Sequence, residues 1–301
     1  MENYAGFVVT RENVFWSLKS NHYEDIIKEN NLEEIDTSNN VTFVRVVFIP
    51  PRNDFQLPID RWVCKINQNI LPVWYDAGTV ELRCRAKLEE WRKAKVVLPE
   101  KVIDTIKENQ IVAIYGTVNH IKGSARVDYI DGSARIGSIS DSVTVNHIHD
   151  SAIVGCIDGS VVVNCIGDFA KVDYIKDSVT VNYIGDSATI CSINGHAKVY
   201  SIRGSAKIES IKDSVRVDYI GGSARVHSIR DSVWVDSVSG SAKVNSIIGS
   251  VSIESISDSV EVNYIGGSAK VERVSGSAKI EHVSSFVKIG RISGSAIVKS
   301  T

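Results

Sequence analysis

From residue 115 to the end of the chain, hydrophobic and polar positions follow a nine-residue period. In units such as SVRVDYIGG and SARVHSIRD, the second position is almost always Ala or Val, the fourth Val or Ile, and the seventh Ile or Val. The third, fifth, sixth and eighth positions vary and are mostly polar. Apolar residues two apart project from one face of a β-strand, and Gly or Asp at the ninth position suits a turn. A fixed period of strand-like units predicts a solenoid, in which each unit stacks on its neighbours.

The second position of the repeat alternates between a larger and a smaller residue. The units that begin at Ser142, Ser160 and Ser178 carry Val there, whereas the units between them carry Ala. This alternation suits two walls that face each other across a thin core, with Val on one wall against Ala on the other. Two units then make one coil. We therefore predict a mainly β protein whose residues 111–301 form a two-walled parallel β-solenoid (β-helix) of nonapeptide repeats, with about 18 residues per coil.

The first 110 residues lack the repeat and predict a small N-terminal α/β domain that caps the solenoid. Apolar residues at helical spacing and a Thr10 cap indicate a helix over residues 11–20. A second apolar stripe indicates a helix over residues 79–91. Two apolar runs, over residues 41–49 and 61–66, predict strands, and the first of them stops at a pair of prolines.

Composition and charge point to a soluble protein of the cytoplasm. The net charge of -2 gives no general basic field of the kind that marks nucleic-acid binders. No apolar run reaches the roughly 18 residues that a transmembrane helix needs, so we expect no membrane partner. The first residues show no basic region followed by an apolar stretch, as a secretion signal would. The five cysteines have no CxxC spacing, which favours a reduced, cytoplasmic compartment.

The outward positions of the repeat form two charged rows. Third positions are often basic and fifth positions often acidic or Asn, so stacked coils place a basic row beside an acidic row. One interpretation is a solvated surface whose opposite charges relieve like-charge stacking, each pair contributing only about 0.2–1 kcal/mol. The other is a patterned surface that a partner binds, and a Trp in a polar row favours it. The candidate partner-binding residues are Trp234, Arg216, Lys198, Arg225 and Lys207.

Residues with catalytic or metal-binding chemistry are few. There is no Gly-rich phosphate loop, no HExxH and no GxSxG, so we assign no catalytic residue and predict a protein that is not an enzyme. His147 and Cys165 share the sixth position in units two apart, so we expect them to be stacked neighbours on adjacent coils, with His149 close by. Such groups bind zinc, but their number and spacing match no known closed site. We therefore predict no metal site and no cofactor.

The last coils carry apolar residues at positions that suggest self-association. The final unit, SAIVKST, is followed by no capping helix, and an uncapped coil leaves a row of backbone groups open to pairing. We expect two copies to meet end to end as a homodimer. The candidate interface residues are Phe286, Ile292 and Ile297.

One resemblance covers most of the chain. The segments VRVVFIPPRND, PIDRWVCKINQNILPVWYD and LEEW, with the repeats behind them, resemble uncharacterised phage and prophage proteins that join such a leading domain to short GSAKV-like or GNSTV-like repeats. The resemblance implies phage origin, action inside an infected or lysogenic bacterium, and no known catalytic residue. We expect a non-enzymatic interaction protein that presents a rigid solenoid surface to a host macromolecule and binds or inhibits a bacterial protein, such as a defence component. Nucleic-acid binding or mimicry along the charged rows, and a structural role in the phage, are the alternatives.

Overall fold

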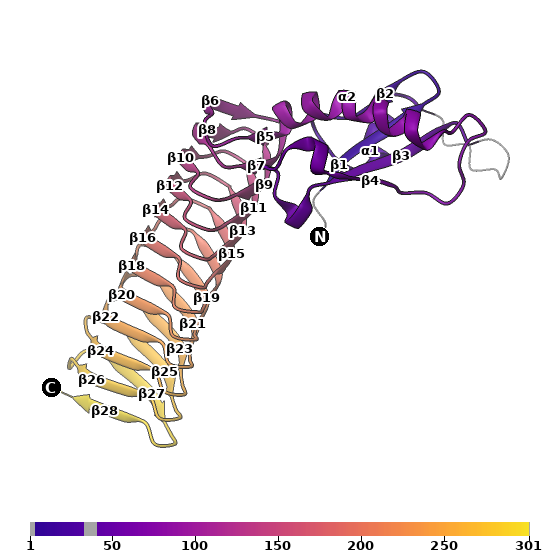
Figure 1. The fold of residues 1–301 in the computed structure, drawn as a ribbon. Helices are drawn as coiled ribbons and strands as arrows, with labels where there is room; N and C mark the ends of the chain where they lie inside the picture. The colour runs from indigo at the N-terminus through magenta and orange to yellow at the C-terminus, as the bar shows by residue number, and fades with distance from the viewer. Residues whose placement is uncertain (1–3, 33–40, 301) are drawn as a thin grey trace. The chain divides into compact units, whose positions relative to one another are not determined.

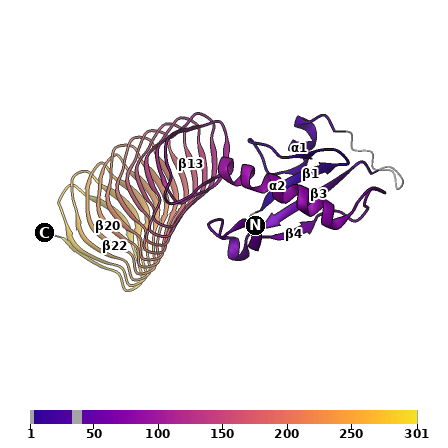
Figure 2. The same cartoon turned by 45° about the horizontal axis from the view of Figure 1, so that its top comes forward.

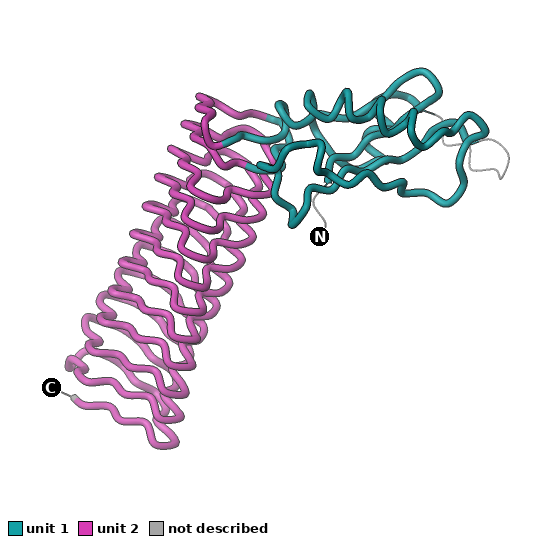
Figure 3. The backbone as a smooth tube through the Cα atoms, viewed as in Figure 1, with its two compact units in different colours: residues 1–98, 108–113 teal, residues 99–107, 114–301 magenta. Residues whose placement is uncertain are grey.

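The computed structural model describes residues 4–32 and 41–300 and divides the chain into two compact units (Figure 3). The first unit comprises residues 1–98 and 108–113, and the second comprises residues 99–107 and 114–301. The chain therefore enters the second unit, returns to the first, and leaves it again. The boundary expected at residue 110 lies inside this interleaved stretch.

The first unit contains a four-stranded antiparallel sheet and two α-helices (Figure 1). The strands lie in the order β2-β1-β3-β4. Its elements are β1 (Ala5–Thr10), β2 (Val14–Phe15), α1 (Tyr23–Glu29), β3 (Phe43–Ile49), β4 (Val63–Ile66), α2 (Ala77–Lys95) and β5 (Val96–Val97), with 3₁₀ turns at Pro51–Asn53 and Ile59–Arg61. A further strand, β7 (Gln110–Ile114), ends where the chain passes back to the second unit.

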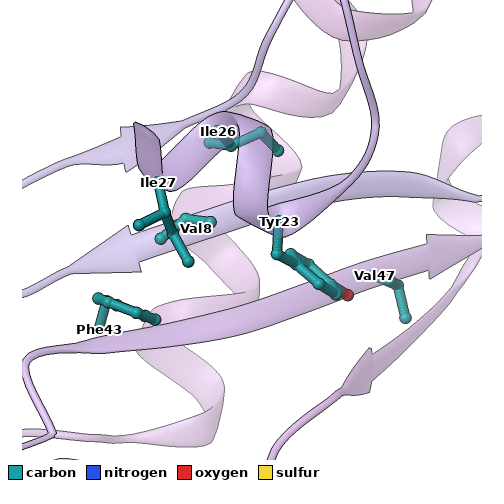
Figure 4. Packing of buried hydrophobic residues seen from close by; sticks show 6 residues of the cluster. All are labelled: Val8, Tyr23, Ile26, Ile27, Phe43 and Val47. Carbon is teal, nitrogen blue, oxygen red and sulfur yellow. The ribbon is translucent and has the colours of Figure 1, made fainter. Parts of the chain in front are cut away.

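Each face of this sheet packs against one helix. On one face, Ile26 and Ile27 of α1 join Val8, Phe43 and Val47 in a buried cluster (Figure 4). Successive strand residues point to opposite faces, so Phe7 and Phe48 lie on the other side. There the rings of Phe7 and Phe48 pack edge to face, and the guanidinium of Arg85 on α2 lies 5.0 Å from the centre of the Phe48 ring.

The structure confirms three of the four predicted N-terminal elements and corrects one. The expected strands are β3 and β4, and the expected helix over residues 79–91 lies within α2, whose N-cap Asp76 accepts a hydrogen bond from the Thr79 N–H at 2.8 Å. The helix predicted over residues 11–20 is wrong, because residues 10–13 turn the chain into a hairpin of β1 and β2. The Thr10 hydroxyl accepts a hydrogen bond from the Asn13 N–H at 3.0 Å, so it stabilises this turn and caps no helix.

The second unit is the predicted two-walled parallel β-solenoid. Its coils stack in Figure 1 and are seen as flattened loops behind one another in Figure 2. We call its two sheets wall 1 and wall 2. Within the unit, wall 1 contains β9 (Arg126–Ile130), β11 (Thr144–Ile148), β13 (Val162–Ile166), β15 (Thr180–Ile184), β17 (Lys198–Ile202), β19 (Arg216–Ile220), β21 (Trp234–Val238), β23 (Ser252–Ile256), β25 (Lys270–Val274) and β27 (Lys288–Ile292). Wall 2 contains β6 (Val102–Lys107), β8 (Thr117–Lys122), β10 (Arg135–Ile139), β12 (Ile153–Ile157), β14 (Lys171–Ile175), β16 (Thr189–Ile193), β18 (Lys207–Ile211), β20 (Arg225–Asp231), β22 (Lys243–Gly249), β24 (Glu261–Ile265), β26 (Lys279–Val283) and β28 (Ile297–Ser300).

Strand register confirms the expected coil of two repeats. On wall 2, Arg135 pairs with Ile153 and Ile153 pairs with Lys171, a step of 18 residues in each case (153 − 135 and 171 − 153). The Val units and the Ala units fall on different walls, as the alternation predicts. Val161 precedes a wall 1 strand and Ala170 precedes a wall 2 strand, and both are fully buried.

Asp and Gly at the ninth position form the turns between walls, as expected. Both residue types adopt a left-handed backbone there, with φ of 63° at Asp213 and 71° at Gly195. Asp also bonds between coils, because the Asp213 carboxylate accepts a hydrogen bond from the Gly195 N–H at 3.0 Å. The same bond recurs along the stack, for example from the Gly240 N–H to Asp258 at 2.9 Å.

Candidate functional site

The predicted partner-binding residues lie on both walls of the solenoid. Lys198, Arg216 and Trp234 occupy the same register position on consecutive strands of wall 1. Lys207 and Arg225 pair in the same way on wall 2. The five residues therefore belong to two separate surfaces, because successive nine-residue units alternate between the walls.

On wall 1, basic and acidic side chains neutralise each other around Trp234. Arg216 forms ion pairs with Asp218 at 3.0 Å and with Asp236 at 2.9 Å. Trp234 donates a hydrogen bond from its indole Nε1 to Asp236, and its side chain is still substantially exposed. Asp236 thus connects the indole to Arg216, which holds Trp234 in a defined orientation on the surface.

A hollow of about 500 Å³ lies beside Trp234. The indole borders it together with residues of the next two strands of wall 1, β23 and β25. Two of these carry opposite charges and pair across strands, since Arg273 lies 2.8 Å from Glu254. The complete lining is Trp234, Ser252, Ile253, Glu254, Lys270, Glu272 and Arg273. An aromatic side chain next to paired charges can receive both an apolar group and a polar group of a partner.

Wall 2 carries a second, larger hollow of about 720 Å³, which crosses strands β16 to β24. Lys207, Arg225 and Lys243 occur in a row along it. Lys243 pairs with Glu261 at 2.6 Å, whereas among the described residues Lys207 and Arg225 have no ion-pair partner within 4.0 Å. Lys207 and Arg225 can therefore bind an anionic group without first breaking an ion pair within the protein.

The structure brings His147, His149 and Cys165 together at the carboxyl ends of two neighbouring wall 1 strands, β11 and β13. His147 on β11 pairs in register with Cys165 on β13, and His149 directly follows β11. One ligand atom from each residue lies within 4.8 Å of the other two. The His149 Nε2 atom is 3.3 Å from the Cys165 Sγ atom. The repeat predicts His147 beside Cys165 with His149 close by, and the structure confirms this arrangement, with the turn after β11 bringing His149 to the thiol.

Burial and neighbouring charges shift the pKa values of this cluster. Burial lowers the pKa of His147, and the neighbouring His149 lowers it further. Burial raises the pKa of the Cys165 thiol, and the carboxylates of Asp186 and Asp168 add to this shift. Without a cation nearby, both groups therefore favour their neutral forms.

Burial also shifts the thiol pKa values of the two cysteines of the first unit, Cys64 and Cys84. Burial raises the pKa of Cys64 to about 11 and that of Cys84 to about 12. A thiol with so high a pKa carries little thiolate at neutral pH and is a poor nucleophile.

The three candidate interface residues are exposed at one end of the second unit. Phe286 is 78% exposed, Ile292 51% and Ile297 48%. At the equivalent repeat position of Ile292, Ile184 and Ile220 are fully buried, because both lie on strands flanked by further coils. The exposure of Phe286, Ile292 and Ile297 is compatible with an interface, and the homodimer stays a prediction.

Comparison with known proteins adds no family. No family model, no curated protein and no solved structure matches the chain. Across residues 4–32 and 41–300, none of the helices combines the length and the apolar character needed to cross a membrane.

Proposed function

We propose that the protein is a non-enzymatic interaction protein whose solenoid walls present a rigid surface to a macromolecular partner. The observation that carries this proposal is the exposed Trp234 beside a hollow on a wall of regularly paired parallel strands. Such a surface binds a partner without losing backbone conformational entropy, because its strands are already fixed by the stack. The resemblance to phage and prophage proteins makes a bacterial host protein the expected partner, with inhibition of that protein as the expected outcome.

The charge pattern around Trp234 supports a protein partner over a polyanion. Arg216 is already paired with two carboxylates, and Arg273 and Lys270 each have an acidic neighbour. Phosphate binding depends on basic groups that are free to release counterions. A protein partner can instead place an apolar side chain against the indole and polar groups against the paired charges.

Affinity capture from bacterial lysate tests this proposal. The tagged protein should retain one stoichiometric host protein through a moderate-salt wash. Trp234→Ala should weaken its binding by about 30-fold, which corresponds to about 2 kcal/mol, with little change in the thermal unfolding midpoint. Tyr174→Ala is the matched control, because Tyr174 is an exposed aromatic residue on wall 2. Equal loss in both variants, or no loss in either, would remove Trp234 from the proposal.

Nucleic-acid binding is the second candidate, and Lys207 and Arg225 of wall 2, which have no ion-pair partner in the part of the chain that the structure describes, favour it. Phosphate contacts would make retention of nucleic acid fall steeply with salt. Recovery of salt-labile nucleic acid without protein, abolished by a Lys207→Ala/Arg225→Ala double variant, would replace the first candidate with this one.

A further inference from the structure

The cluster of His147, His149 and Cys165 offers two imidazoles and one thiol to a common point. Nitrogen and sulfur donors together select borderline and soft metal ions, Zn²⁺ above all, over Mg²⁺ or Ca²⁺. In contrast to the sequence pattern, which predicts no metal site, we propose that these three side chains bind a single Zn²⁺ ion on wall 1, leaving its fourth coordination position to solvent or to an external ligand.

The spacing of the donor atoms fits a tetrahedral ion. Zn–N bonds of about 2.0 Å and Zn–S bonds of about 2.3 Å place neighbouring N and S ligands about 3.5 Å apart in a tetrahedron. The His149 Nε2 atom and the Cys165 Sγ atom are 3.3 Å apart. The third donor, from His147, lies within 4.8 Å of both, so a small side-chain rotation completes the set.

Neighbouring residues lie against both imidazoles. The Nδ1 atom of His149 lies 3.8 Å from the Asp168 carboxylate, which is longer than a hydrogen bond, while its Nε2 atom faces Cys165. A small shift of the Asp168 side chain would let it accept a hydrogen bond from the Nδ1–H of a metal-bound His149, the contact that fixes the tautomer of such an imidazole. The His147 ring stacks on Tyr129 with centroids 4.9 Å apart. Its Nδ1 atom is buried and has no hydrogen-bond partner among residues 4–32 and 41–300, a cost that a metal bond or a metal-bound water would remove.

The surroundings leave room for a cation and attract one. A Cβ atom on Gly167 would lie 3.3 Å from His149 Nε2 and 2.8 Å from Asp186, so the glycine keeps this side of the imidazole open. Asp168 and Asp186 place negative charge around the thiol. These carboxylates disfavour a free thiolate, but they favour a divalent ion that carries the thiolate as its ligand.

A thiol–imidazole nucleophile is the competing explanation, because Cys165, His149 and Asp168 lie in the order of a catalytic triad. One observation argues against it: a triad gives no role to His147, whose ring lies 5.0 Å from that of His149.

Metal titration of the full-length, chelator-treated protein tests the proposal. One equivalent of Zn²⁺ should bind and survive dialysis, and Co²⁺ should give a thiolate-to-metal charge-transfer band with tetrahedral visible absorption. Cys165→Ser should abolish the charge-transfer band, and His147→Ala and His149→Ala should each weaken Zn²⁺ binding by about 100-fold or more. Cys156→Ser is the matched control, since the Cys156 thiol is half-buried beside Asp158 on wall 2 and should leave both signals unchanged.

Alkylation of the wild-type protein gives a readout that does not depend on variants folding. Zn²⁺ should protect Cys165 from iodoacetamide and leave Cys156 unprotected. Less than one-fifth of an equivalent of bound Zn²⁺, or a Co²⁺ spectrum without a thiolate band, would overturn the proposal. Rapid alkylation of Cys165 that depends on His149 and is unaffected by Zn²⁺ would also overturn it, in favour of the nucleophile.

Discussion

Aspartate at the ninth position of the repeat has two roles in one residue. It adopts the left-handed backbone of the turn, and its carboxylate binds the N–H of the coil before it, as Asp213 binds Gly195. Glycine at the same position supplies only the backbone conformation. Both residues therefore occur at the turns, because each satisfies the requirement for positive φ.

Substitutions at Asp213 should separate these two roles. Asp213→Asn keeps an acceptor and tolerates positive φ, so its stability should stay near that of the wild type. Asp213→Gly loses the inter-coil hydrogen bond, worth about 0.5–1.5 kcal/mol. Asp213→Ala also places a Cβ in the left-handed region, at a further cost of about 1–2 kcal/mol. Thermal unfolding midpoints should fall in the order Asn, Gly, Ala, and an Ala variant as stable as Asn would contradict this explanation.

At the scale of the strand, each wall is specified by the size of one inward residue. Wall 1 units carry mostly Val at the second position and wall 2 units mostly Ala, and both types are fully buried in the thin core between the walls. Close packing leaves no room to exchange them freely. The larger residue of one wall therefore fills the space left by the smaller residue of the other in most coils.

Overpacking wall 2 should destabilise the solenoid. Ala206 is fully buried directly before β18, so Ala206→Val should cost about 1–3 kcal/mol. Lys207→Val, at the next position and on the outer face, should change stability by less than about 0.5 kcal/mol. Denaturant unfolding of both variants is the measurement, and equal stability would show that the core is looser than the burial indicates.

At the scale of the whole molecule, the exposed apolar residues at one end of the second unit predict self-association. Phe286, Ile292 and Ile297 each expose about half or more of their surface, on or just before the last strand of each wall. Light scattering should give a dimer mass, and Phe286→Ser combined with Ile292→Ser should give a monomer. A wild-type monomer at all concentrations would exclude the homodimer, and a trimer would favour a structural role in the phage.

Much of the second unit was predictable because its sequence repeats. Each nine-residue unit indicates the same strand, turn and inward positions, so a unit that departs from the pattern can still be assigned from its neighbours. The first unit has no such redundancy. The apolar stripe of Val80, Cys84, Leu88 and Trp91 was long enough to identify α2, but the short apolar pattern near Phe15 fitted a helix and a hairpin equally well.

The sequence by itself determined the solenoid, its coil length and the residues that face its core, because these follow from local periodicity. Only the tertiary structure decided which outward residues share a surface, since register and wall assignment separate Lys207 and Arg225 from Trp234. It also placed Lys95 of α2 in the interior, where its ammonium group donates a hydrogen bond to the Leu18 carbonyl at 2.8 Å. The repeat also places His149 near His147 and Cys165, but only the structure decided the donor distances, such as 3.3 Å between His149 Nε2 and Cys165 Sγ, because the turn after β11 and the side-chain rotamers set them.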